Sequence, residues 1–252
     1  GGKGTRLSEE TTIKPKPMVE IGGKPILWHI MKYYSSFGYT NFILALGYKS
    51  NYIKEYFYNN RFSQNDFTIN SDPTIEPKFH NLSKDNKWNI TFIDTGLETL
   101  KGARIKRIEK YVKTENFHLT YGDGLSDVDL KKLVEFHVEH KKTATVTAVR
   151  PPSRFGEMTI NSNNVVEDFE EKSQMNTGYI NGGFFVLNKG IMDHLDTDPM
   201  CDFEFGPMQE LAKNNKLMAF RHDGFWQCMD NVRERDFLNS LVTKNKAPWI
   251  KW

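Results

Sequence analysis

Short apolar segments typical of strands alternate with amphipathic segments typical of helices along most of this chain. Strands are expected at 41–48, 89–95, 116–121, 144–149, 165–171, 184–187 and 217–220, and helices at 27–37, 51–59, 105–112, 130–138, 204–214 and 232–243. Such alternation favours βαβ units, in which parallel strands form a sheet with helices on both faces. We therefore expect an α/β fold, with a mostly parallel, Rossmann-like mixed sheet flanked by helices.

One polar stretch interrupts the alternation. Residues 60–88 are rich in Asn, Ser, Asp and Pro and show little periodicity. An insertion of this length fits a lid, an inter-subunit arm or a plain surface loop, and the sequence leaves these alternatives open. With 252 residues and no linker-like tract, we expect a single domain over 1–252.

Composition excludes several function classes. The net charge is only +2, which argues against a nucleic-acid partner. No apolar run is long enough to span a membrane, so we expect no membrane partner. The two cysteines, Cys201 and Cys228, are too few for a disulfide scaffold and favour a reducing cytoplasm. We expect small-molecule substrates and a homo-oligomer.

The first 24 residues, GGKGTRLSEETTIKPKPMVEIGGK, carry groups suited to binding a triphosphate. Glycines let backbone N–H groups approach phosphate oxygens closely, and an arginine adds a planar fork of donors. Lys16 adds a point charge, and Pro15 and Pro17 stiffen the backbone that carries it. The residues expected to bind the nucleotide here are Gly1, Gly2, Lys3, Gly4, Thr5 and Arg6.

Two aspartates follow apolar segments that end at the expected ligand crevice. Asp123 lies in Gly122-Asp123-Gly124 after the strand at 116–121, and Asp230 follows Phe225–Met229. Ligands bind beyond the carboxyl ends of parallel strands, and Mg²⁺ takes carboxylate and phosphate oxygens. The alternatives are a turn aspartate at 123 and a helix N-cap at 230. The phosphate-binding groups of the first 24 residues favour Asp123 as a Mg²⁺ ligand, with Gly122 contacting the nucleotide, whereas at Asp230 the residues alone leave both alternatives open.

The glycine-rich turn, the string IKPKPMVEIGGKPILWHIM at 13–31 and the C-terminal Ala247-Pro248-Trp249 together resemble the sugar-1-phosphate nucleotidylyltransferases. The likeness covers nearly the whole chain and is strongest to members that use CTP and glucose 1-phosphate. It implies the nucleotide-diphospho-sugar transferase type of fold. In this family an apolar strand leads into the glycine turn, and we expect one to precede Gly1 in the protein.

The resemblance also implies roles for residues that their chemistry alone would not single out. It implies that Asp230 is the second Mg²⁺ ligand beside Asp123. Glu171 would bind sugar hydroxyls and Lys172 the sugar phosphate, although Ser173 replaces the proline of the family motif. Asn181 and Gly182 would also contact the sugar. In the segment 95–104, Lys-Gly-Ala-Arg stands where cytidylyltransferases of this type have a Thr-Gly-Gly-Arg-like run. Thr99 and Arg104 would read the base there, and an exposed basic helix face is the alternative.

The implied reaction is transfer of CMP from CTP to α-D-glucose 1-phosphate, which gives CDP-glucose and pyrophosphate. Lys16 would bridge the α-phosphate and the attacking phosphate, and Arg6 would stabilise the charge that develops on pyrophosphate. Alternatives within this class use dTTP, UTP or GTP with another hexose 1-phosphate. A non-catalytic nucleotide-sugar sensor on the same fold is a further alternative, although a sensor has no need of the metal-binding aspartates.

Overall fold

A mixed five-stranded sheet forms the centre of the molecule. The computed structural model describes residues 11–80, 87–151, 157–160, 162, 164–170 and 178–252. The sheet consists of β7 (Asn116–Leu119), β9 (Ala144–Val149), β12 (Ile180–Asn181), β13 (Phe185–Asn188) and β14 (Leu217–His222). Strand β14 runs parallel to β9, whereas β13 lies between β9 and β7 and is antiparallel to both. Strand β12 pairs antiparallel with the C-terminal end of β9.

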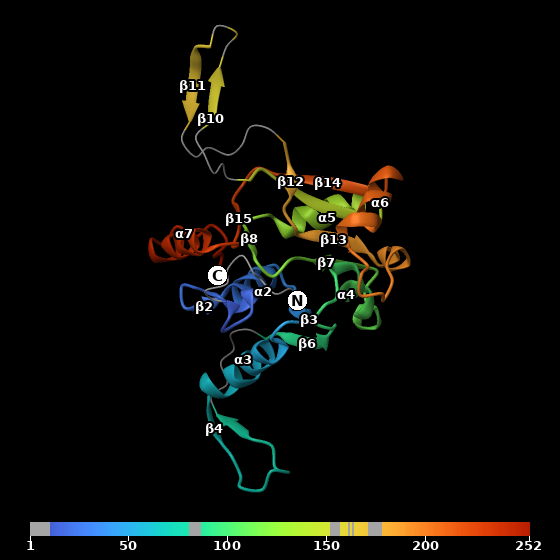
Figure 1. Cartoon of the computed structure of the whole chain (residues 1–252). Coiled ribbons are helices and arrows are strands. Elements are labelled where there is room, and N and C mark those ends of the chain that lie inside the picture. The colour runs from blue at the N-terminus through green and yellow to red at the C-terminus, as the bar shows by residue number, and fades with distance from the viewer. Residues whose placement is uncertain (1–10, 81–86, 152–156, 161, 163, 171–177) are drawn as a thin grey trace.

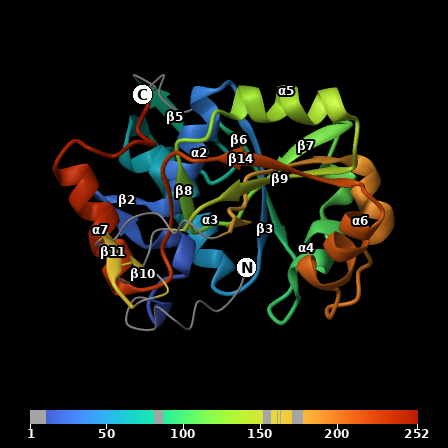
Figure 2. The same cartoon turned by 90° about the horizontal axis from the view of Figure 1, so that it is seen from above.

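A second, parallel pair joins β3 (Asn41–Leu46) to β6 (Asn89–Asp94) in register along their whole lengths. The α-helices are α2 (Ile26–Ser36), α3 (Ser50–Ser63), α4 (Lys101–Arg107), α5 (Leu130–His140), α6 (Gln209–Lys213) and α7 (Val232–Thr243). Figure 2 shows α5 on one side of β9 and β14, with α4 and α6 on the other. The expected α/β fold, with parallel strands flanked by helices, is confirmed.

The shorter elements connect and flank this framework. Short helical segments lie at η2 (Lys16–Met18), η3 (Glu109–Tyr111), η4 (Lys189–His194) and η5 (Glu204–Met208). Antiparallel pairs form between β1 (Glu20–Ile21) and β2 (Lys24–Pro25), between β8 (Gly124–Ser126) and β15 (Trp226–Cys228), and between β10 (Glu157–Ile160) and β11 (Val166–Glu170). None of the helices in the described part of the chain is both long and apolar enough to cross a membrane.

Helix α2 anchors the main core. Its apolar residues recur at helical spacing, and Ile26, Ile30 and Tyr33 are almost fully buried. They pack with Leu130 from α5 and with Trp249 near the C-terminus, which is 0% exposed. Burial of large side chains of this kind from distant parts of the sequence is the main force holding these elements together.

The polar insertion contains more regular structure than its composition indicates. Helix α3 continues to Ser63, and β4 (Asp66–Thr68) pairs antiparallel with β5 (Lys78–His80). Figure 1 shows β4 projecting away from the body of the molecule beyond α3. The rings of Phe67 and Phe79 in this hairpin contact each other and the ring of Phe62 at the end of α3. Aromatic contacts therefore stabilise the hairpin, although the sequence of this segment shows no periodicity that would predict it.

Candidate active site

The helical turn η2 holds Lys16 in a fixed position. Pro15 is its N-cap and Pro17 lies inside it, so two of its backbone φ angles are restricted by pyrrolidine rings. The N–H of Met18 donates to the carbonyl of Pro15 at 2.7 Å, and Val19 donates to Lys16 at 3.1 Å. Met18 is 1% exposed and anchors the turn in the core. The ammonium group of Lys16 is therefore carried on a rigid support.

The pairing of β8 with β15 brings the two aspartates together. Cys228 lies opposite Gly124, and the N–H of Met229 donates to the carbonyl of Asp123 at 2.8 Å. Gly122 lies against η2, because a Cβ at this position would be 3.1 Å from Cγ of Pro17. A larger residue at 122 would push the aspartate turn away from the lysine turn.

Lys16 lies between the two carboxylates. Its Nζ is 2.5 Å from Oδ2 of Asp123 and 2.6 Å from Oδ1 of Asp230. Burial lowers the pKa of Lys16, but the charge of Asp123 and the hydrogen bonds to both carboxylates outweigh this effect, and the pKa is raised overall. The lysine is consequently protonated at neutral pH. Three residues predicted from separate motifs thus form one charged cluster.

The cluster has the donor chemistry of a magnesium site. Both carboxylates direct an oxygen to one cation, here the ammonium of Lys16. Carboxylate oxygens are the ligands that Mg²⁺ prefers, usually one or two of them together with substrate phosphates. The side chains of Asp123 and Asp230 are 31% and 19% exposed, so they face a partly open space. These two residues therefore fit the expected cation.

Two neighbours of Asp230 were missed by the sequence analysis. Sγ of Cys228 is 3.9 Å from Oδ2 of Asp230, and burial raises the pKa of this thiol to about 12, so it remains protonated. Oε2 of Glu234 accepts a hydrogen bond from the backbone N–H of Asp230 at 2.5 Å. The sequence pattern Asn231-x-x-Glu234 at the start of a helix is the signal that could have revealed this second contact.

The predicted base-reading residues organise the loop after β6. Arg104 is 6% exposed, so the alternative of an exposed basic residue at this position is wrong. Its Nη1 donates to the carbonyl of Leu46 at 3.1 Å and to the hydroxyl of Thr95 at 2.7 Å. Oγ1 of Thr99 accepts from Nη1 of Arg107 at 3.1 Å. Direct contact of Thr99 and Arg104 with a base stays a prediction, because the contacts seen here are within the protein.

The predicted sugar-binding residues lie beside Tyr121. Oδ1 of Asn181 accepts from the N–H of Gly183 at 2.9 Å, and its Nδ2 donates to the hydroxyl of Tyr121 at 3.0 Å. Gly182 allows close packing of two strands, because a Cβ there would be 2.6 Å from Cγ1 of Val149. Tyr121, which sequence reasoning did not select, thus connects Asn181 to the Gly122-Asp123 turn.

Part of the predicted site lies outside the described residues. This applies to Gly1, Gly2, Lys3, Gly4, Thr5 and Arg6, and to Glu171 and Lys172. Their roles stay predictions.

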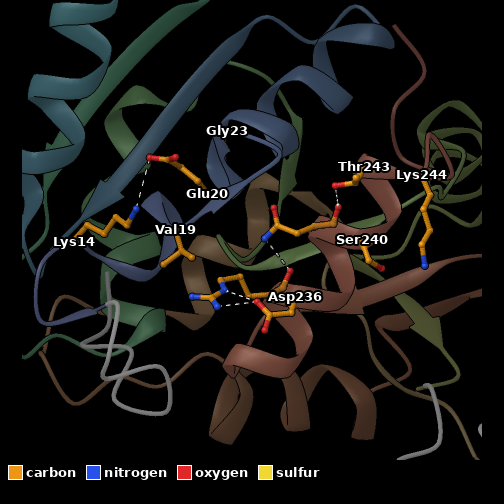
Figure 3. Close-up of a pocket in the computed structure, with 10 residues that line it drawn as sticks. Lys14, Val19, Glu20, Gly23, Asp236, Ser240, Thr243 and Lys244 are labelled. Atoms are coloured by element: carbon orange, nitrogen blue, oxygen red, sulfur yellow. Dashed lines mark hydrogen bonds and ion pairs between the residues drawn. The ribbon is translucent and has the colours of Figure 1, made fainter.

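A groove of about 670 Å³ lies between the η2–β2 segment and α7 (Figure 3). Four of the charged side chains that line it form ion pairs with each other: Lys14 lies 3.6 Å from Glu20, and Arg235 lies 2.7 Å from Asp236. Lys16, Asp123 and Asp230 are not among the residues that line this groove. We therefore place the chemistry at the lysine–carboxylate cluster and not in this groove.

Comparison with known proteins identifies the class. Residues 1–227 match the family model described as nucleotidyl transferase. The chain belongs to this family, and the expectation that it is a nucleotidyltransferase enzyme is confirmed.

Its relatives define the group more narrowly. The chain is 49% identical over 253 residues to a glucose-1-phosphate cytidylyltransferase of Salmonella typhimurium, a match that covers all of this chain and 97% of the relative. It is 42% identical to a probable glucose-1-phosphate cytidylyltransferase of Bacillus subtilis, again over all of this chain and 97% of the relative. The resemblance stated from the sequence motifs is confirmed by these matches.

Solved structures agree on the fold. An apo UDP-glucose pyrophosphorylase matches with a TM-score of 0.65 at 17% identity, covering 98% of this chain and 96% of the other. The HddC protein of Yersinia pseudotuberculosis matches with a TM-score of 0.64 at 24% identity, covering 90% of each chain.

Proposed function

We propose that this enzyme transfers CMP from CTP to α-D-glucose 1-phosphate and releases CDP-glucose and pyrophosphate. The observation that carries the proposal is the convergence of Lys16, Asp123 and Asp230 in a chain so similar to glucose-1-phosphate cytidylyltransferases. A phosphate oxygen of the sugar 1-phosphate attacks the α-phosphorus in line. The bond from the α-phosphorus to the bridging oxygen breaks, and pyrophosphate leaves with the bonding electrons.

This reaction needs no strong general base, because the attacking phosphate oxygen is already anionic. Catalysis then depends on positioning the two substrates and neutralising their combined negative charge. Asp123 and Asp230 would hold Mg²⁺, which would neutralise charge on the triphosphate. Lys16 remains protonated, as the raised pKa implies, and contributes its charge next to the same phosphates.

Specificity for the base is proposed to come from the loop after β6. Arg104 donates to the carbonyl of Leu97 in this loop and to that of Leu46 at the end of β3. Arg107 donates to the carbonyl of Thr95 in the loop and to that of Thr197, which follows η4. Hydrogen bonds from guanidinium groups to carbonyls stiffen a loop and fix which of its polar groups remain available. A stiff loop with fixed polar groups rejects a base that leaves those groups unpaired.

The test is pyrophosphate release measured for CTP, UTP, GTP and dTTP, each with glucose 1-phosphate and with mannose 1-phosphate. We expect the highest kcat/KM for CTP with glucose 1-phosphate. A clear preference for another nucleotide would refute the proposal that CTP is the substrate, while the chain would remain a nucleotidyltransferase. Nucleotide binding without pyrophosphate release under any combination would favour the sensor.

A further inference from the structure

We propose that Glu234 is a positioning residue of the metal site and acts through the backbone of Asp230. The inference rests on the proposed role of Asp230 as a Mg²⁺ ligand and extends it to a residue on α7 that does not itself need to touch the metal.

The contact arises from the way α7 begins. Asn231 is the N-cap, and its Oδ1 accepts from the backbone N–H of Glu234 at 3.0 Å. Glu234 turns back, and its Oε2 accepts from the N–H of Asp230 at 2.5 Å. This resembles a capping box, except that the glutamate reaches the residue before the N-cap. The helix start therefore binds the metal-site aspartate through its main chain.

Asp230 is held from several sides at once. Oδ1 accepts from Nζ of Lys16 at 2.6 Å, and Oδ2 lies 3.9 Å from Sγ of Cys228. The neighbouring residue, Met229, donates its N–H to the carbonyl of Asp123. Among these contacts, the hydrogen bond that the backbone N–H of Asp230 donates to Glu234 connects Asp230 to helix α7. Removing that acceptor leaves the N–H of Asp230 without this bond and gives the carboxylate more freedom.

Position, rather than charge, is the role that the geometry favours. Oε2 of Glu234 is already used by an N–H group at a short hydrogen-bond distance. A glutamine could accept the same hydrogen bond through its amide oxygen while lacking the negative charge. Residues that orient metal ligands typically affect metal affinity by 10–100-fold when they are removed. If Glu234 acts by position, Glu234→Gln keeps metal affinity and Glu234→Ala loses it. If Glu234 acts by its charge, both variants lose metal affinity.

The experiment compares Glu234→Ala and Glu234→Gln with Asp236→Ala. Asp236 is also a carboxylate in the first turns of α7, but its side chain is 60% exposed and its bond is to Arg235. Two quantities are measured: the Mg²⁺ concentration for half-maximal pyrophosphate release, and Mn²⁺ binding followed by electron paramagnetic resonance. Hydrogen exchange of the amides around 226–234 reports the backbone directly.

We expect Glu234→Ala to raise the half-maximal Mg²⁺ concentration by about 10-fold or more, to weaken Mn²⁺ binding in parallel and to speed exchange at the Asp230 amide. Glu234→Gln should stay close to the wild type in all three measurements, as should Asp236→Ala. A thermal unfolding curve checks that each variant is folded.

Equal losses in Glu234→Gln and Glu234→Ala would overturn the proposal in favour of a charge effect. Unchanged metal binding in Glu234→Ala would overturn it outright. Because Mn²⁺ binding and hydrogen exchange need no substrate, they decide the role of Glu234 even if the wild type proves to prefer another nucleotide.

Discussion

Acidification should destabilise this protein through two neutral histidines, one on a strand of the central sheet and one on the helix that packs against it. His137 on α5 is 2% exposed; its Nδ1 lies 2.8 Å from the hydroxyl of Thr145 and its Nε2 lies 3.3 Å from Oδ1 of Asn116. His118 on β7 packs against the ring of Tyr39 at 4.4 Å between centroids. Burial lowers the pKa of both histidines to about 4, with the neighbouring histidine charges as a smaller cause.

The direction of the effect follows from proton uptake. In the unfolded chain each histidine has a pKa near 6.5, so it gains a proton below that pH, whereas the folded protein takes it up only near pH 4. The unfolded state therefore binds more protons in this window, and stability falls as the pH drops from about 6.5 towards 4. Between about pH 7.5 and about pH 5, the loss is about 2 kcal/mol for each histidine and roughly 4 kcal/mol for both.

The assay is urea unfolding at these two pH values for the wild type, His137→Gln, His118→Gln and the double variant. Carboxyl groups also titrate on acidification, but they contribute equally to all four proteins and cancel in the comparison. Each single variant should lose about 2 kcal/mol less than the wild type on acidification. If the wild type and the double variant show the same loss, these histidines are not held neutral by the fold and the reasoning is wrong.

Three further predictions concern the reaction. Asp123→Asn should lose most pyrophosphate release at modest Mg²⁺, because a charged ligand of the metal is lost; near-wild-type turnover would remove Asp123 from the metal site. Lys16→Ala should lower kcat more than it raises KM for the nucleotide, since its charge matters most as negative charge is redistributed around the α-phosphorus; a change in KM alone would make Lys16 a binding residue. Arg104→Ala should narrow the preference for CTP over UTP in kcat/KM, because the guanidinium no longer connects the loop carbonyl of Leu97 to the carbonyl of Leu46 at the end of β3; an unchanged ratio would exclude Arg104 from base selection.

Local sequence patterns determined the class of fold and the centre of the site. The 3.6-residue period at 27–34 predicted α2, and the apolar runs at 41–48 and 89–95 predicted the parallel pair β3 and β6. Lys16 and Asp123 could be selected because each lies in a recognisable local motif, between two prolines and between two glycines, and Asp230 because it follows an apolar run in a chain that resembles a known family. Side-chain chemistry and backbone restriction are local properties, so they can be read without knowing the fold.

Tertiary structure decided what depends on neighbours distant in the sequence. The apolar run at 184–187 gives no direction, and only pairing with β7 and β9 makes β13 antiparallel between them. The amphipathic pattern around Arg104 does not reveal that its guanidinium is buried against the end of β3. Lys16 meets Asp230 across 214 positions, a contact that exists only because β15 pairs with β8. Such contacts arise when whole helices and strands pack together, and a local stretch of sequence does not determine which elements become neighbours.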